Sequence, residues 1–126
     1  MKKLPKIHFK IIPHKKMRYD TSGDYWFARK ILQFRVSLLK CADYQFMVLI
    51  HELVEWYLCA RKGVTPKMID AFDFANQHLE GKQGDDKKAP YHNQHKFADK
   101  IERLLCKEMK LNWKKYDASF DDLEYK

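Results

Sequence analysis

Three ionisable residues lie close together inside an otherwise apolar stretch, residues 45–60 (QFMVLIHELVEWYLCA). They are His51, Glu52 and Glu55. On a helix, His51 and Glu55 are one turn apart and point the same way. A buried carboxylate must be paired, protonated or bound to a metal, because burying it alone costs several kcal/mol. A divalent ion satisfies an imidazole and a carboxylate together, so this stretch predicts a metal site.

The element that would position these residues is a helix over residues 45–60. We expect it to be buried on all sides, because its apolar residues leave no broad polar face. Asp43 is the expected N-cap. Arg61 and Lys62 lie where cations favour the helix dipole, and Gly63 ends the helix.

The pattern His51-Glu52-x-x-Glu55 resembles the His-Glu-x-x-His helix of zincin metallohydrolases. The resemblance implies that His51 and Glu55 bind one divalent ion and that Glu52 is the general base for the metal-bound water. This chain departs from the family at Glu55, where zincins have histidine. Carboxylate is a harder ligand, so iron and manganese are alternatives to zinc, which remains the expected ion. The implied reaction is hydrolysis, with a peptide bond as the first expectation.

Two histidines further along the chain could complete the site. His92 and His95 occur in the segment PYHNQH, at the expected start of the last helix, and share a face because they are three apart. Catalytic zinc sites use three protein ligands and keep one open position. We expect His95 to be the third ligand and His92 a reserve ligand. The alternative is two surface histidines at a helix end.

Four further polar residues are candidates for supporting roles. Glu102, two turns after His95, could orient a histidine. The Tyr91 hydroxyl could donate to a transition-state oxyanion. Asp70 and Asp73 lie three apart on the next expected helix, and one of them could face the site. Ordinary surface or packing roles are the alternatives for each.

Two other kinds of metal site are alternatives to the zincin pattern. Glu52-x-x-Glu55 followed by Asp70-x-x-Asp73 vaguely resembles the acidic motifs of MazG-type nucleotide pyrophosphohydrolases, which bind magnesium. Those proteins are helical from the start, whereas this chain opens with strand-like patterns. A helical di-iron or di-manganese carboxylate site is disfavoured, because no Glu-x-x-His motif occurs.

Composition limits the class of protein. The 126 residues, 45% apolar and 14% aromatic, predict one globular domain over residues 1–126. No apolar run is long enough for a membrane span, and no secretory signal is visible. Cys41, Cys59 and Cys106 show no CxxC spacing, so we expect reduced thiols and a cytoplasmic location.

The net charge of +8 lies wholly in the first third of the chain. Residues 1–40 hold 11 Lys and Arg against two Asp, whereas residues 41–126 are close to neutral. A basic segment can attract nucleic acid or another polyanion. A solvated lysine-rich surface is the plainer interpretation.

The order of the local patterns predicts an α+β fold with a small N-terminal antiparallel sheet followed by three main helices. The expected strands are residues 6–12, 25–27 and 31–38, and the expected helices are residues 45–60, 65–78 and 94–110. Residues 1–18 form a basic N-terminal segment that includes the first strand, and residues 111–126 form a tail that packs loosely or as a short helix. This order also resembles a minimal zincin domain.

Several segments across residues 19–117 resemble a family of small uncharacterised bacteriophage and prophage proteins. They are SGDYWF, ILQFRVS, HELVEWYLC, IDAFD, GDDKKAPYHNQH and FADKIERLL. The resemblance implies a small protein made in the cytoplasm of an infected bacterium and assigns no reaction. A second class of function therefore stays open, in which a structural metal or buried polar network supports binding to a host protein or nucleic acid.

Overall fold

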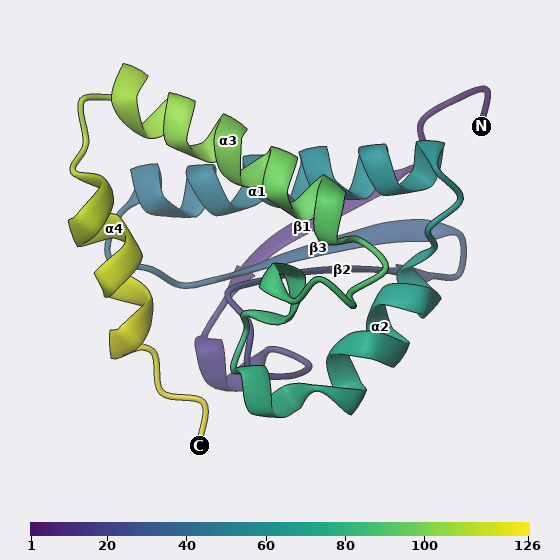
Figure 1. The fold of residues 1–126 in the computed structure, drawn as a ribbon, viewed down its shortest axis with the longest axis horizontal. Coiled ribbons are helices and arrows are strands. Elements are labelled where there is room, and N and C mark those ends of the chain that lie inside the picture. The colour runs from purple at the N-terminus through teal and green to yellow at the C-terminus, as the bar shows by residue number, and fades with distance from the viewer.

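A three-stranded sheet forms the N-terminal third of the molecule in a computed structural model that describes residues 1–126 (Figure 1). Its strands are β1 (Ile7–Ile12), β2 (Gly23–Ala28) and β3 (Ile31–Ser37), in the order β1-β3-β2. Arg29 and Lys30 connect β2 to β3 with positive φ angles of 51° and 70°, as a tight hairpin between twisted strands requires. The predicted α+β class is confirmed.

The prediction of an antiparallel sheet is wrong for β1. β2 and β3 pair antiparallel, but β1 pairs parallel with β3. The physical reason is the connection over residues 13–22, which includes a short 3-10 turn at His14–Lys16. It carries the chain past β3 to its far edge, so β2 runs opposite to both other strands.

The alternation in β3 places one apolar face under the helices. Leu32, Phe34 and Val36 are fully buried, because alternate residues of a strand point to the same face of the sheet. The strand was expected to reach residue 38, but Leu38 lies beyond its end and is 59% exposed.

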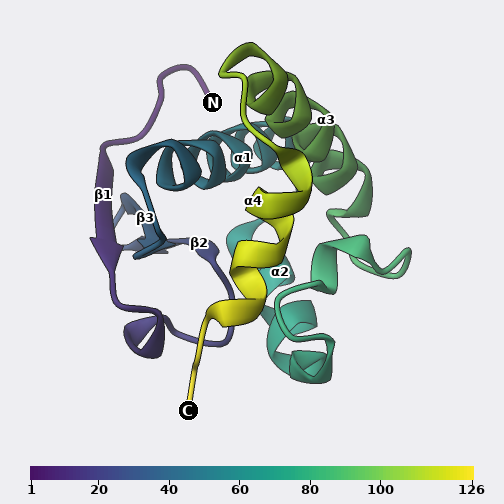
Figure 2. The ribbon, with the colours of Figure 1, turned by 90° about the vertical axis from the view of Figure 1, so that its left-hand side faces the viewer.

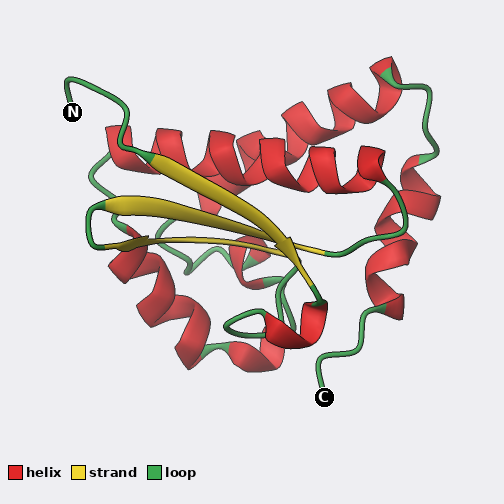
Figure 3. Cartoon of the chain, turned by 180° about the vertical axis from the view of Figure 1, so that it is seen from behind, coloured by secondary structure: helices red, strands yellow, loops and turns green.

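Four helices follow the sheet: α1 (Ala42–Arg61), α2 (Pro66–Ala75), α3 (His92–Glu108) and α4 (Trp113–Ser119). Figure 2 shows α3 alongside α1 and α4 crossing beside them, and Figure 3 shows the sheet on one side of α1. The three main helices are therefore present. The tail is not loose, because α4 buries Tyr116 completely. No helix has both the length and the apolar character that crossing a membrane requires.

Helix α1 differs from its prediction in two details. Cys41 is its N-cap and Asp43 lies in the first turn, where a carboxylate still favours the helix dipole. The expectation of burial on all sides is also wrong, because no element covers the outer face. Phe46 and Tyr57 on that face are 45% and 41% exposed. Polar side chains instead occupy part of the buried face, among them His51 and Glu55.

Helices α2 and α3 follow their local signals closely. Thr65 caps α2 by accepting a hydrogen bond from the Met68 N–H at 3.2 Å, and Pro66 is the first helical residue, as expected. α2 ends at Ala75, earlier than the expected residue 78, and a short 3-10 turn follows. The early end leaves a long segment that folds back toward the start of α3.

Candidate metal centre

Helices α1 and α3 bring His51, Glu55 and His95 together. His51 Nε2 lies 3.1 Å from His95 Nδ1 and 3.2 Å from Glu55 Oε2, and His95 Nδ1 lies 2.9 Å from the same Glu55 oxygen. Two nitrogens and one oxygen therefore form a triangle with edges near 3 Å. In the sequence these residues are up to 44 positions apart, and the packing of α1 on α3 is what joins them.

The outer nitrogen of each imidazole faces a carboxylate. Glu102 Oε1 lies 2.7 Å from His51 Nδ1, and Asp85 Oδ1 lies 3.3 Å from His95 Nε2. Asp99 stands near both rings, at 3.5 Å from His51 Nδ1 and 3.7 Å from His95 Nε2. A carboxylate on the outer nitrogen holds the proton there and leaves the inner nitrogen as a free electron-pair donor.

This donor set fits one divalent ion. Ligands about 2.1 Å from a tetrahedral zinc ion stand about 3.4 Å from one another, close to the edges of the observed triangle. Two overlapping groups of side chains offer ligand atoms within 4.8 Å of one another. These groups are His51 with Glu52 and Glu55, and His51 with His95 and Asp99. His51 belongs to both groups and is the centre of the arrangement.

Tyrosines from distant elements hold the carboxylates in place. The Tyr25 hydroxyl on β2 donates to Glu55 Oε1 at 2.8 Å. The Tyr116 hydroxyl on α4 donates to Glu102 Oε2. Each carboxylate thus has one oxygen fixed by a tyrosine and one directed to a histidine, so sheet and helix orient both acids from outside.

Without a metal, protons hold the same atoms together. Burial by itself lowers the pKa of His95, but hydrogen bonds with Asp85 and Glu55 outweigh it and raise that pKa to about 10. Burial also opposes the charge on His51, yet Glu102 and Glu55 raise its pKa well above the usual value. Burial disfavours the Glu55 carboxylate, but His51 and His95 hold its pKa at about 2. A metal ion must displace these protons, so its affinity rises with pH.

Glu52 has a different environment from Glu55. It is 9% exposed, no protein donor reaches its carboxylate, and it lines a cavity of about 330 Å³ beside the histidines. Burial, followed by the nearby Glu55 charge, raises the Glu52 pKa well above the usual value. A Cβ atom at Gly23 would stand 2.2 Å from Glu52 Oε1, so only glycine leaves room for this carboxylate.

His92 does not join the group. Its Nδ1 lies 2.9 Å from the Gly84 carbonyl oxygen, which ties it to the segment before α3. Gly84 also lies directly against His95, since a Cβ atom there would stand 2.4 Å from the ring. Of the two histidines, the structure therefore brings only His95 to the centre.

The remaining candidates form separate structural pairs. Tyr19 and Tyr91 donate to the two oxygens of Asp73 at 2.5 and 2.6 Å, so the Tyr91 hydroxyl is already used. Arg18 binds Asp70 through two nitrogens, at 2.9 and 3.0 Å. Asp70 and Asp73 lie outside both groups of ligand atoms, so the four carboxylates of the MazG-like pattern do not converge.

Sequence reasoning missed several members of the centre. Asp99 follows His95 by four residues, and this spacing alone could have placed it on the same face. Tyr25 and Tyr116 carried no local signal, because only the tertiary fold brings them to Glu55 and Glu102.

A second hydrogen-bonded cluster contains a serine, a histidine and an aspartate, the residue types of a serine hydrolase. His14 Nδ1 lies 2.8 Å from Ser37 Oγ, and His14 Nε2 lies 2.7 Å from Asp20 Oδ1. Ser37 is fully buried and does not line the cavity, so no substrate can reach its oxygen. This hydrogen-bonded cluster connects the 3-10 turn to the end of β3, so its role is structural.

Comparison of the chain with protein-family models, with curated proteins and with solved structures finds no match. The function of the chain is therefore inferred from the geometry of the centre.

Replacing Gly84 with alanine is expected to weaken metal binding about tenfold, because the new methyl group pushes the His95 ring out of position. Zinc affinity of the Gly84→Ala variant, measured by competition with a chelator, checks this. An affinity equal to that of the parent would show that the ring is not held by this contact.

The pKa of Asp73 predicts that the free energy of unfolding depends on pH. Burial raises its pKa from 3.8 to about 6, although Tyr19 and Tyr91 donate to it. Because the folded state holds the proton more tightly, the contribution of Asp73 to stability falls by about 2 kcal/mol as pH rises from 4 to 6. Asp73→Asn lacks this component, so urea unfolding of both proteins at several pH values should give profiles that diverge over this range. Parallel profiles would contradict the assignment.

Proposed function

We propose that the protein is a metal-dependent hydrolase in which His51, Glu55 and His95 bind one zinc ion, with iron or manganese as alternatives. One observation carries the proposal: two imidazole nitrogens and a carboxylate oxygen converge at 2.9–3.2 Å. The outer nitrogens face carboxylates, as they do around protein-bound metals. The bound zinc ion would supply Lewis-acid chemistry, lowering the pKa of a water molecule toward neutrality and polarising a carbonyl group.

Glu52 is the general base in this proposal. It stands next to the ligand atoms, and no protein group occupies its carboxylate. The raised pKa makes the Glu52 carboxylate a stronger base, which would accept a proton from the attacking water and then pass it to the leaving group. Gly23 supports this role by leaving the space that the Glu52 side chain needs.

The bond cleaved is proposed to be a peptide bond, through the resemblance of the His51–Glu55 segment to the zincin helix. The choice of a peptide substrate rests on the motif, because one fold can act on many substrates. The cavity beside Glu52 supplies an opening from which a substrate can approach the centre.

A second candidate function is binding without catalysis. The raised pKa values of His51 and His95 describe a buried network that is satisfied by protons alone. In this case the centre stabilises the fold, and the basic residues 1–40 contact a host protein or nucleic acid.

We place the protein in the cytoplasm of a bacterial host, following its resemblance to phage proteins. The supporting observation is that Cys41, Cys59 and Cys106 are all free thiols, which is typical of reducing compartments.

Metal analysis tests the centre directly. The protein, purified without added metal or chelator, is expected to hold about one equivalent of zinc, iron or manganese per chain. His51→Ala should lose the metal, because His51 belongs to both groups of ligand atoms. His92→Ala is the matched control and should keep it, because His92 faces Gly84. Absence of metal from the parent, even after zinc is supplied, would favour the structural network.

Glu52→Gln separates catalysis from metal binding. Glutamine has the same shape but cannot accept the proton, so peptide hydrolysis should fall by about 10²-fold or more. Metal content should stay at the parent level, because the three proposed ligands remain. A Glu52→Gln protein that hydrolyses peptide substrates at the parent rate would remove Glu52 from the mechanism.

A further inference from the structure

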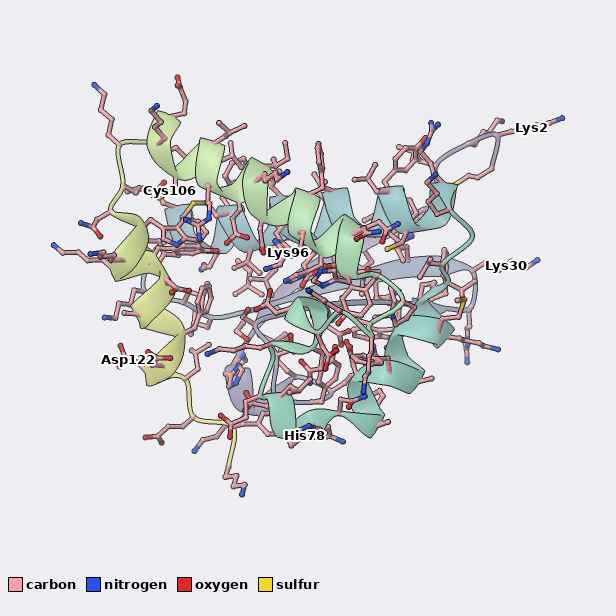
Figure 4. The ribbon with its side chains drawn as sticks, in the orientation of Figure 1. Lys2, Lys30, His78, Lys96, Cys106 and Asp122 are labelled. Atoms are coloured by element: carbon pink, nitrogen blue, oxygen red, sulfur yellow. The ribbon has the colours of Figure 1, made fainter.

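The cavity beside the candidate metal centre gathers most of the acidic residues of a basic protein. Its lining includes 11 of the 17 Asp and Glu residues but only one of the 25 Lys and Arg residues, Lys82. The chain as a whole carries a net charge of +8. Charge is therefore sorted by position, with acids around the cavity and lysines on the rest of the surface. In Figure 4, the labelled Lys2 and Lys30 lie at the opposite end of the molecule from Asp122, which follows α4.

The deep carboxylates of the cavity already have partners. Glu55 and Glu102 face histidines, Asp73 accepts from two tyrosines, and Asp24 is bound by Arg18 at 2.7 Å. These four paired carboxylates do not account for all of the negative charge of the cavity. Glu80, Asp117 and Asp121 line the cavity without an ion pair, and they are exposed at its outer part.

Helix α4 shows how the sorting arises. Asp117 and Asp121 are four residues apart and line the cavity together with Trp113 and Phe120. Lys114 and Lys115 lie on α4 with Asp117 but outside the lining, and Asp121 belongs to the 3-10 turn Phe120–Asp122 that follows α4. The helical segment thus turns acids and aromatic rings toward the cavity. Carboxylates beside aromatic surfaces suit a lysine or arginine side chain, whose stem is apolar and whose end is charged.

Glu52 independently indicates that the cavity receives a ligand. It is 9% exposed, it faces the cavity, and no protein group satisfies it. The adjoining depression adds Lys96 and Arg103 to Lys82, so the two hollows together hold three cations against 11 acidic residues, and only part of the negative charge is offset. Lys96 pairs with Asp85 at 3.0 Å, and Arg103 stacks over Trp113 at 4.2 Å.

We propose that this cavity binds a peptide through a basic side chain, with Asp117 and Asp121 holding the ammonium or guanidinium group. The reaction that follows rests on the proposed hydrolytic function, but recognition of the cation does not require the metal. A cavity of about 330 Å³ lies at the small end of ligand sites, so it holds one side chain and not a folded partner. An acid-lined cleft also raises the local concentration of cationic substrates.

The test compares two blocked tetrapeptides that differ only in one central residue, lysine or glutamate. Their binding is measured by calorimetry with zinc-loaded Glu52→Gln protein, which leaves the peptide uncleaved, and again with the metal-free parent. We expect the lysine peptide to bind about tenfold more tightly than the glutamate peptide, and added salt to reduce the difference. Asp117→Asn with Asp121→Asn should remove most of this preference.

The matched control is Asp122→Asn with Glu124→Gln. It changes the net charge by the same amount in the same segment, but neither residue lines the cavity, and Asp122 pairs with Lys40 at 3.4 Å. The control should keep the preference for lysine. Equal binding of the two peptides, no binding of either, or equal loss in both double variants would overturn the proposal. A different result would contradict the hydrolytic function alone. In that case the protein would bind no metal or cleave no peptide, but the metal-free protein would still prefer the lysine peptide.

Discussion

The packing of α1 against α3 through buried ionisable groups is the constraint on which the rest of the structure depends. His51 and Glu55 face His95 and Glu102 across this interface at 2.7–3.2 Å. Isolated charges at such positions would cost several kcal/mol, so each group requires its partner. The two helices can therefore pack in only one register, and that register creates the convergence of three ligand atoms.

The other elements close around this interface. β2 supplies Tyr25 to Glu55 and leaves space for Glu52 at Gly23. α4 supplies Tyr116 to Glu102. These contacts hold the carboxylates in place without an ion, so the centre is preorganised. Loss of either tyrosine would therefore have two effects. It would weaken the contact of β2 or α4 with the helices, and it would release a carboxylate of the centre.

Charged residues are distributed unevenly around the centre. Acidic residues line the cavity, whereas lysines cover the remaining surface of a chain with net charge +8. The inner acids are paired with histidines, tyrosine hydroxyls and Arg18, so the acids without a protein partner are Glu52 and the outer carboxylates. The proposed metal ion and the proposed basic side chain of a peptide would satisfy different parts of this charge distribution.

The sequence by itself determined the order of the secondary-structure elements and the part of the centre that lies on α1. Hydrophobic period, caps and turn residues depend on near neighbours, so the α+β order and the shared face of His51 and Glu55 followed from spacing. Only the tertiary structure decided the parallel pairing of β1, the choice of His95 over His92, and the contacts of Tyr25 and Tyr116. These features depend on the path of the chain between distant segments. Local patterns carry no information about that path, whereas the packing of α1, α3 and the sheet fixes it.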